Sequence, residues 1–226
     1  MSTLNLPLLS APLTPCPCPP DLHVMRAKRS LRRAADLLSV AGVPVAEATK
    51  VLAREPTSPV TQAIKLWGDD EEPCKNLITS SASAASEWRK TMARIIAHLE
   101  SDNSGRPVFR GWYFGSSAQR AEFMRPILEQ GFFVNPRIGM SASRSRRVSS
   151  SAAFLNRHGV IWEIRVPRTA RDFAPIFDAI GAKYPEQREV VFPRHSRFVL
   201  MEAPRKLTML RGGQKLRVPY LVFEEA

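Results

Sequence analysis

The spacing of the apolar residues changes once along the chain, at Asp102-Asn-Ser-Gly105. Before this point apolar residues recur every three or four positions, which is the period of an α-helix with one buried face. After it they alternate with polar residues or form short runs of β-branched and aromatic side chains, which is typical of strands. Helices and strands segregated in this way predict an α+β fold, and 226 residues suffice for one ordinary domain.

The half before the change is predicted to be helical. Asp21 and Ser58 are residue types that cap helix N-termini, and the second precedes a proline at the first helical position. The predicted helices run from Asp21 to the break at Gly42 and Pro44, from Val45 to Arg54, from Ser58 to Trp67, and from about 76 to 100. The last is the longest, with one buried stripe, and an acidic turn over residues 68–73 comes before it.

The half after the change alternates strands with short helices. Predicted strands cover residues 107–114, 132–136, 140–143, 159–166, 190–192, 197–202 and 217–223. Helices are predicted over residues 117–130 and 148–156, the second with Phe154 facing inward, and a turn or short helix over 173–180.

Residues 1–20 are expected to be disordered, because six prolines in this segment forbid a helix or a central strand. An export signal for a specialised secretion system, an organelle-targeting peptide and a plain flexible tail remain alternatives. Three cysteines without framework spacing argue against a disulfide scaffold, and no His or Cys cluster has metal-ligand spacing. No apolar run approaches the roughly 18 residues of a membrane span.

The formal charge of +12, with a pI of about 10.3, predicts an anionic partner or ligand. The basic residues comprise 25 Arg and 8 Lys. Arginine binds phosphate through a planar fork, so this bias fits phosphate recognition, and it fits an Arg-rich genome equally well. Nucleic acid is an alternative partner, although no nucleic-acid-binding motif is present.

The stretch from Tyr184 to Phe198 begins as a turn and ends as a strand. Glu189 lies where the turn becomes the strand, and a carboxylate fixed there can stabilise a developing positive charge. If strand pairing reaches back to Gln187, its amide points the same way as Glu189. The alternative is that Glu186, Gln187 and Glu189 are ordinary polar residues of a surface turn.

Three earlier residues are further candidates. Arg110 lies in an aromatic strand, where a guanidinium requires a carboxylate or phosphate partner, and Gly111 after it would admit a ligand close to the backbone. Ser141 and Ser143 present two hydroxyls to one face of a strand. The structural alternatives are an ion-pair role for Arg110 and a backbone-bonding role for Ser141.

In chain order, Phe109-Arg110-Gly111, Ser141-Ala142-Ser143 and Gln187-Arg188-Glu189 resemble the three motifs of the Arg/Ser/Glu class of mono-ADP-ribosyltransferases. The third resembles the Gln-x-Glu form of clostridial exoenzymes that modify Rho GTPases. Tyr184 matches the aromatic residue of their target-recognition turn. Phe154 and Arg157 resemble the Phe-x-x-Arg of the loop that contacts phosphate and nicotinamide. The resemblance covers about residues 105–225.

The resemblance implies a two-sheet β-sandwich with flanking helices, preceded by a helical segment. It divides the chain into a segment over 1–20 and one domain over 21–226, helical over 21–102 and NAD-binding over 103–226. It implies NAD as a substrate without a metal. It also implies a bacterial toxin or effector, such as a type III effector, that is secreted into host cytoplasm to modify a host protein, for example a small GTPase.

The resemblance also assigns a role to each candidate. Glu189 would stabilise the charge that develops on the ribose, Arg110 would pair with phosphate or ribose, and Ser141 would hold both carboxylate and ribose. The remaining assignments are Gly111 and Phe154 to nicotinamide, Arg157 to phosphate, Ser143 to support, and Gln187, Tyr184 and Glu186 to the acceptor. Gln187 implies an acceptor other than arginine, unless a shift in the turn presents Glu186. The alternatives are an inactive module that binds a host protein or nucleic acid, and an enzyme that hydrolyses NAD without an acceptor.

Overall fold

The computed structural model describes residues 31–69, 77 and 80–226. The predictions for residues 1–20, the helix start at Asp21 and most of the acidic turn lie outside the described residues.

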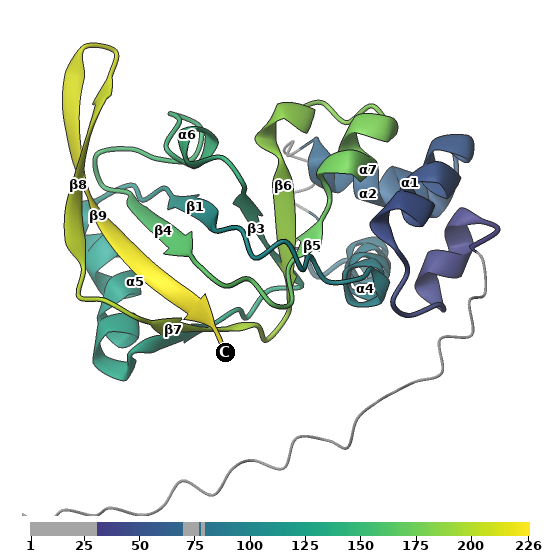
Figure 1. Ribbon diagram of the computed structural model, residues 1–226, viewed down its shortest axis with the longest axis horizontal. Helices are drawn as coiled ribbons and strands as arrows, with labels where there is room; N and C mark the ends of the chain where they lie inside the picture. The colour runs from purple at the N-terminus through teal and green to yellow at the C-terminus, as the bar shows by residue number, and fades with distance from the viewer. Residues whose placement is uncertain (1–30, 70–76, 78–79) are drawn as a thin grey trace, which may run out of the picture. The chain divides into compact units, whose positions relative to one another are not determined.

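Four helices and one short 3-10 helix form a layer with its own apolar core. They are η1 (Ala34–Leu38), α1 (Val45–Arg54), α2 (Pro59–Gly68), α4 (Ser83–His98) and α7 (Ala174–Ala179). The fully buried Leu52, Ile64, Met92 and Ile96 lie in this core, which also includes Val191 of the sheet. Figure 1 shows α1, α2, α4 and α7 gathered beside β6 and β5. The helical first half is thus confirmed.

Two predicted helices differ from the structure within the described residues. Residues 34–38 form only the short η1, because carboxylates take up backbone N–H groups there: Asp36 accepts from the amides of Arg32 and Arg33 at 2.9 Å each. The start of the helix predicted from about residue 76 lies mostly outside the described residues; Leu77 is helical, residues 80–82 are not, and α4 begins at Ser83. In this break the Ser80 hydroxyl accepts from the Ala82 amide, and the Arg89 guanidinium donates to the Ser80 carbonyl.

The strands of the described residues form one hydrogen-bonded ladder in the order β2-β7-β9-β4-β1-β3-β6-β5, with β8 paired to β9. Their bounds are β1 (Val108–Trp112), β2 (Phe132–Val134), β3 (Gly139–Ser143), β4 (Val160–Ile164), β5 (Arg171–Asp172), β6 (Glu189–Pro193), β7 (Arg197–Leu200), β8 (Arg205–Arg211) and β9 (Gln214–Glu225). Strands β1 and β3 join at a single register pair, Phe109 with Ser143. The ladder therefore has two halves that meet at one point.

The two halves share a second apolar core. Trp162 and Phe223 come from one half, Val190 and Phe192 from the other, and all four are essentially inaccessible to solvent. Helix α5 (Ser117–Gln130) also contributes to this core. It spans residues 117–130 as predicted; the Ser116 hydroxyl caps its start, and Gly131 follows its end in the left-handed conformation. The expected pair of sheets thus exists as two halves of one ladder, and the α+β class is confirmed.

The second half of the sequence contains two strands that were not predicted, β5 and β8, and one helix that was misplaced. Strand β8 pairs with β9 as a hairpin, and its inward residues Leu207 and Met209 pack against a third small core. Helix α6 (Arg146–Ser149) is shorter and earlier than the predicted 148–156. It begins where the Ser145 hydroxyl caps it, and Phe154 lies in the turns that follow.

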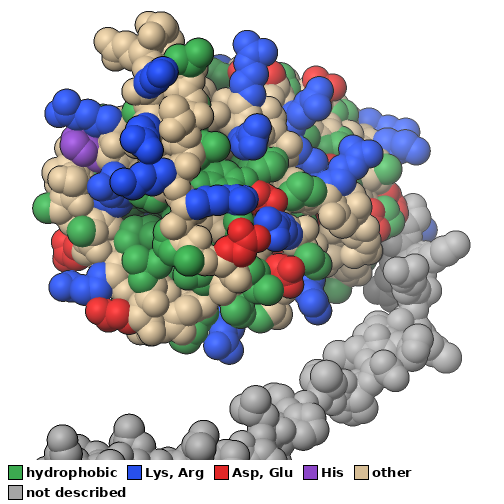
Figure 2. Space-filling model, turned by 60° about the vertical axis from the view of Figure 1, so that its left-hand side comes forward, with side chains coloured by type: hydrophobic (Ala, Val, Ile, Leu, Met, Phe, Trp, Pro, Cys, Tyr) green, Lys and Arg blue, Asp and Glu red, His purple; other side chains and the backbone are tan. Residues whose placement is uncertain are grey.

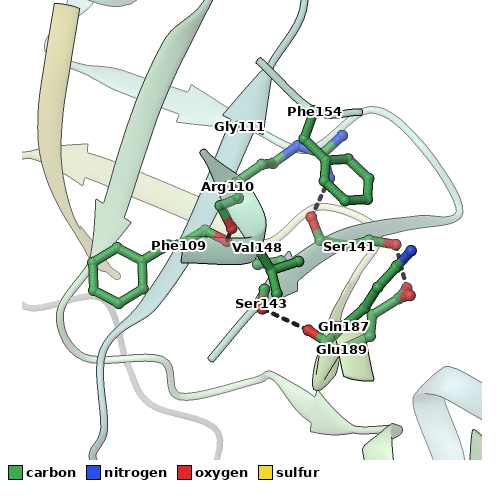
Figure 3. Close-up of a pocket in the computed structure, with 11 residues that line it drawn as sticks. Phe109, Arg110, Gly111, Ser141, Ser143, Val148, Phe154, Gln187 and Glu189 are labelled. Atoms are coloured by element: carbon green, nitrogen blue, oxygen red, sulfur yellow. Dashed lines mark hydrogen bonds between the residues drawn. The ribbon is translucent and has the colours of Figure 1, made fainter. Parts of the chain in front are cut away.

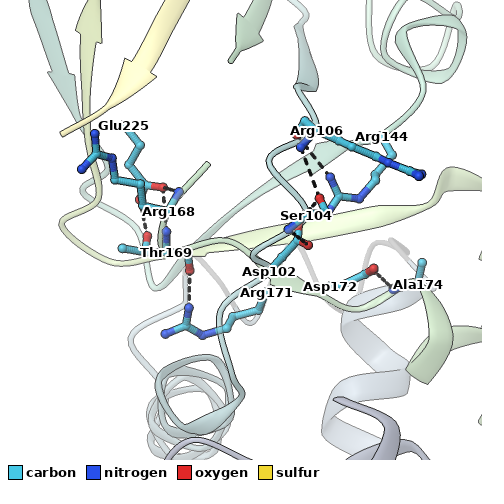
Figure 4. Close-up of polar contacts among 10 residues, drawn as sticks. All are labelled: Asp102, Ser104, Arg106, Arg144, Arg168, Thr169, Arg171, Asp172, Ala174 and Glu225. Atoms are coloured by element: carbon cyan, nitrogen blue, oxygen red, sulfur yellow. Dashed lines mark hydrogen bonds and ion pairs between the residues drawn. The ribbon is translucent and has the colours of Figure 1, made fainter. Parts of the chain in front are cut away.

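The last strand is held by a buried carboxylate. Glu225, only 1% exposed, accepts from the backbone amides of Arg168 and Thr169 and from the Thr169 hydroxyl. Arg171 then binds the Thr169 carbonyl at 2.6 Å and the Ile96 carbonyl at the end of α4 at 2.9 Å. Figure 4 shows the contacts among Arg168, Thr169, Arg171 and Glu225. They tie the C-terminal strand to the helical layer. In the described part of the chain, no helix is long and apolar enough to cross a bilayer.

Candidate active site

A cavity opens where β1 and β3 part beyond their single register pair. Its lining residues come from β1, β3, α6, the turns after α6, and the stretch that enters β6. They are Phe109, Arg110, Gly111, Ser141, Ala142, Ser143, Val148, Ser149, Phe154, Gln187 and Glu189 (Figure 3). The three motifs of the sequence, which are far apart along the chain, therefore meet in one wall.

The cavity is small. Its volume is about 50 Å³, whereas pockets that bury a drug-sized ligand measure about 300–1,000 Å³. As it stands, the cavity does not enclose a ligand of that size.

Glu189 is the first residue of β6 and is 7% exposed. Two donors converge on its Oε1 atom: the Ser141 hydroxyl at 2.5 Å and the Trp67 indole Nε1–H at 2.8 Å. Ser141 reaches it diagonally across the β3–β6 pair, because Ser143 is the residue directly opposite Glu189. The carboxylate is thus held between a strand and helix α2.

Trp67 was not predicted to belong to this site. The sequence shows it only as the last apolar residue of a predicted helix. A buried indole N–H needs an acceptor, but the acceptor lies 122 residues away in the sequence. Only the packing of α2 against β3 and β6 identifies it.

Ser143 and Gln187 are joined through the backbone. The Ser143 hydroxyl donates to the Gln187 carbonyl at 2.5 Å and accepts from the Ser145 amide at 2.9 Å. Gln187 ends the short 3-10 helix η2 (Pro185–Gln187), and Arg188 follows in the left-handed conformation with φ of 48°. Strand pairing therefore does not reach back to Gln187, although this residue still lines the cavity.

The Arg110 guanidinium lies between the two halves of the ladder. Its Nη1 donates to the Ser141 carbonyl, and its Cζ lies 4.2 Å from the centroid of the Trp112 ring. A cation over an aromatic face is stabilised by the ring quadrupole. The serine motif and the arginine motif are thus in direct contact.

Gly111 is required by packing within the chain. A Cβ atom at this position would lie 2.1 Å from the Ser149 carbonyl oxygen and 2.8 Å from that of Phe154. The face on which a ligand was expected to approach is filled by the backbone after α6. Phe154 itself is half-buried and lines the cavity.

Three predicted residues lie away from the cavity wall. Arg157 is exposed, and its Nε donates to His158 Nε2 at 3.0 Å. Tyr184 is half-buried just before η2, with the Lys183 ammonium 5.3 Å from its ring centroid. Glu186 is exposed within η2. All three lie in segments adjacent to the lining residues.

A partly buried ion pair lies next to the strand that carries Ser141 and Ser143. The Arg144 guanidinium pairs with the Asp102 carboxylate, with side chains 15% and 9% exposed, and also donates to the Arg106 carbonyl (Figure 4). The Arg144 amide donates to the Arg188 carbonyl at 3.2 Å. Burial lowers the pKa of Arg144, and the charge of Asp172 opposes this shift. The pair links the segment before β1 to the turn that carries Gln187 and Glu189.

The surface on the side of the β8–β9 hairpin is basic. Figure 2 shows Lys and Arg side chains spread widely over this face. The exposed residues of the hairpin include Lys206, Lys215 and Arg217. Among the described residues, no group of three or more His, Cys, Asp or Glu side chains is placed to hold a metal ion.

Solved structures of bacterial ADP-ribosyltransferases have a similar fold. Plx2a, a toxin from Paenibacillus larvae, is 15% identical over 83% of this chain and 99% of that chain, with a TM-score of 0.51. Exoenzyme S from Pseudomonas aeruginosa, solved with human 14-3-3 protein beta and carba-NAD, is 13% identical over 79% and 89%, with a TM-score of 0.50.

A third structure, HopU1 of Pseudomonas syringae pv. Tomato DC3000, is 16% identical over 75% of this chain, with a TM-score of 0.44; the match spans 66% of that longer chain. No protein-family model and no curated protein sequence matches this chain. The first two matches show that this chain has the fold of the ADP-ribosyltransferases.

Proposed function

We propose that this chain is an NAD-dependent mono-ADP-ribosyltransferase that modifies a side chain of a host protein. The observation that carries the proposal is the meeting of Arg110, Ser141 and Glu189 at one cavity within an ADP-ribosyltransferase fold. Exoenzyme S, which shares this fold, has been solved with the NAD analogue carba-NAD. The residues that line the cavity supply a carboxylate, a guanidinium, hydroxyls and an aromatic ring, and this combination fits a charged dinucleotide.

The reaction breaks the bond between C1′ of the ribose and the nicotinamide nitrogen. The bonding electrons leave with nicotinamide, so positive charge develops on the ribose as in glycoside cleavage. Glu189, held by the Ser141 hydroxyl and the Trp67 indole, supplies the fixed negative charge that stabilises this state. A nucleophilic side chain of the acceptor then bonds to C1′ and releases its proton to solvent.

The other residues bind and orient the dinucleotide. Arg110 supplies a cation for phosphate or ribose, with Arg157 as a second cation at the edge of the site. Phe154 offers an aromatic surface for nicotinamide, beside the backbone of Gly111. Because the cavity measures about 50 Å³, we propose that the turns carrying Phe154 and Arg157 move when NAD binds.

The acceptor is proposed to be recognised by the turn before β6. Gln187 lines the cavity while Tyr184 and Glu186 lie next to it, so the acceptor side chain would enter along this turn. The resemblance to Gln-x-Glu exoenzymes favours an acceptor other than arginine, such as an asparagine of a small GTPase. Delivery as a virulence effector into host cytoplasm follows from the same resemblance, and residues 1–20 would carry the export signal.

The test measures two products. Nicotinamide release from NAD reports cleavage without an acceptor, and labelled NAD added to a host-cell lysate reports transfer to protein. Glu189→Gln keeps the size of the side chain and removes its charge, so both signals should fall by at least about 100-fold. Glu186→Gln, an exposed change in the same turn, is the matched control and should release nicotinamide at the wild-type rate.

Two results would replace the proposal. Nicotinamide release without labelled protein would indicate NAD hydrolysis as the activity. Wild-type NAD consumption equal to that of Glu189→Gln would leave an inactive binding module, which salt-sensitive binding to RNA or to a host protein would then identify.

A further inference from the structure

The helical layer contributes a polar group directly to the carboxylate of the site. Trp67, the penultimate residue of α2, places its indole Nε1–H 2.8 Å from Glu189 Oε1. Both side chains are 7% exposed, so water competes little for this hydrogen bond. This donor meets the same oxygen as the Ser141 hydroxyl, from a separate element of the fold.

The indole is fixed by its neighbours. It stacks on Trp88 of α4, with ring centroids 6.0 Å apart and an interplanar angle of 22°. A glycine makes room beside it, since a Cβ at Gly139 would lie 3.0 Å from the Trp67 ring. The next residue of α2, Gly68, packs against the Phe177 ring, which a Cβ there would approach to 2.8 Å. A side chain held in this way donates without a large loss of rotamer entropy.

We propose that Trp67 is a positioning residue for the reaction: its indole N–H fixes the rotamer of Glu189, so that the carboxylate faces the ribose. The proposal rests on the proposed function above. Two donors on Oε1, coming from β3 and from α2, define the plane of the carboxylate better than Ser141 does alone. A fixed anion stabilises the developing positive charge without reorganising during the reaction.

Trp67→Phe tests the proposal, because phenylalanine keeps an aromatic ring in the stack and removes only the donor side of the indole. In the nicotinamide-release assay, kcat should fall about tenfold while KM changes little, since a hydrogen bond to a charged group is lost in the transition state. The acidic limb of the pH–kcat profile should move to higher pH, because the ionised carboxylate has lost a donor.

A shift of the acidic limb of the pH–kcat profile can be attributed to Glu189 only if the neighbouring charged groups do not change. Arg110 is the other charged side chain among the residues that line the cavity. Arg144, which follows β3, is paired with Asp102. Glu186 and Arg188, in the turn before β6, are exposed to solvent.

Trp88→Phe is the matched control. Its indole N–H donates to the Ala63 carbonyl at 3.3 Å, within the same aromatic pair but away from Glu189. This variant should lose similar stability and keep kcat and the acidic limb of the wild type. If kcat falls equally in Trp67→Phe and Trp88→Phe, and the acidic limb of the pH–kcat profile moves in neither, Trp67 contributes only to packing. That result would overturn the proposal.

A second measurement does not depend on activity. In nitrogen–proton correlation NMR spectra, the indole resonance of Trp67, assigned as the peak missing from Trp67→Phe, should shift in Glu189→Gln, while that of Trp88 stays in place. An unmoved resonance would overturn the proposal even if the enzyme is active. A shifted resonance in a protein that does not consume NAD would confirm the contact, refute the proposed function, and with it refute a role in catalysis.

Discussion

Replacing Gly111 by alanine tests whether this glycine serves packing or ligand approach. The added Cβ would lie 2.1 Å from the Ser149 carbonyl oxygen and 2.8 Å from the Phe154 carbonyl oxygen. Both are backbone atoms, so neither moves away by a change of rotamer. The backbone from Ser149 to Phe154 would have to shift as a unit, and the Phe154 ring, which lines the cavity, would move with it.

The expected cost is at the upper end of the range for overpacked sites, about 3 kcal/mol. For a chain of this size, 1 kcal/mol changes Tm by about 2–4 °C, so Tm should fall by roughly 6–12 °C. The assay is thermal unfolding followed by circular dichroism. NAD binding to the folded variant is measured at a temperature well below its transition.

Gly115→Ala is the control for this prediction. Its Cβ would meet only the end of the exposed Gln119 side chain, nearest at Oε1 at 3.0 Å; this oxygen accepts from the Gly115 amide and can rotate away. The cost should be within about 0.5 kcal/mol. The reasoning is wrong if Gly111→Ala unfolds within about 2 °C of wild type yet has lost NAD binding. That result would show that the glycine is there for the ligand.

Two further predictions concern a partly buried ion pair and a buried tyrosine. Arg144→Met removes the cation from the Asp102 carboxylate, which still accepts from the Ser104 amide, so urea denaturation should show a loss of about 1–3 kcal/mol in the free energy of unfolding. The prediction fails if adding Asp102→Asn to Arg144→Met restores no stability. Burial, together with a hydrogen bond to Glu163, raises the pKa of Tyr220 to about 12. The folded state then holds this proton where the unfolded chain has lost it, so stability should fall from pH 10 to 12. The fall should be smaller in Tyr220→Phe, and equal slopes for the two proteins would contradict the assignment.

Local signals were sufficient for much of the secondary structure. The bounds of α1 and α5 follow from apolar spacing and from end signals, such as the left-handed Gly131 after α5. Strand β8 was missed because its outward residues Lys206, Thr208 and Leu210 are exposed and do not give a regular apolar and polar alternation, and only pairing with β9 makes it a strand. The start of α4 was misplaced because side chains of its own neighbourhood bind the preceding backbone.

Some residues of the candidate site were predicted from the sequence, and others are identified only by the structure. Arg110, Ser141 and Glu189 were predicted because each has a recognisable residue type at a strand position. Trp67 could not be predicted, since its partner Glu189 lies 122 residues away in the sequence. Arg144 could not be predicted either, since its partner Asp102 lies in the segment before β1. The geometry therefore adds the residues that hold the predicted ones in place.

The position of the cavity follows from the sheet itself. Strands β1 and β3 share one register pair and then diverge, so their backbones leave an opening that Arg110 enters from one side and Glu189 faces from the other. A continuous ladder would have closed this opening with hydrogen bonds between the two strands. The helical layer covers the β3–β6 face and supplies the Trp67 donor to Glu189. The sheet alone would expose that apolar face and leave the carboxylate with one donor fewer, so helices and strands together position Glu189.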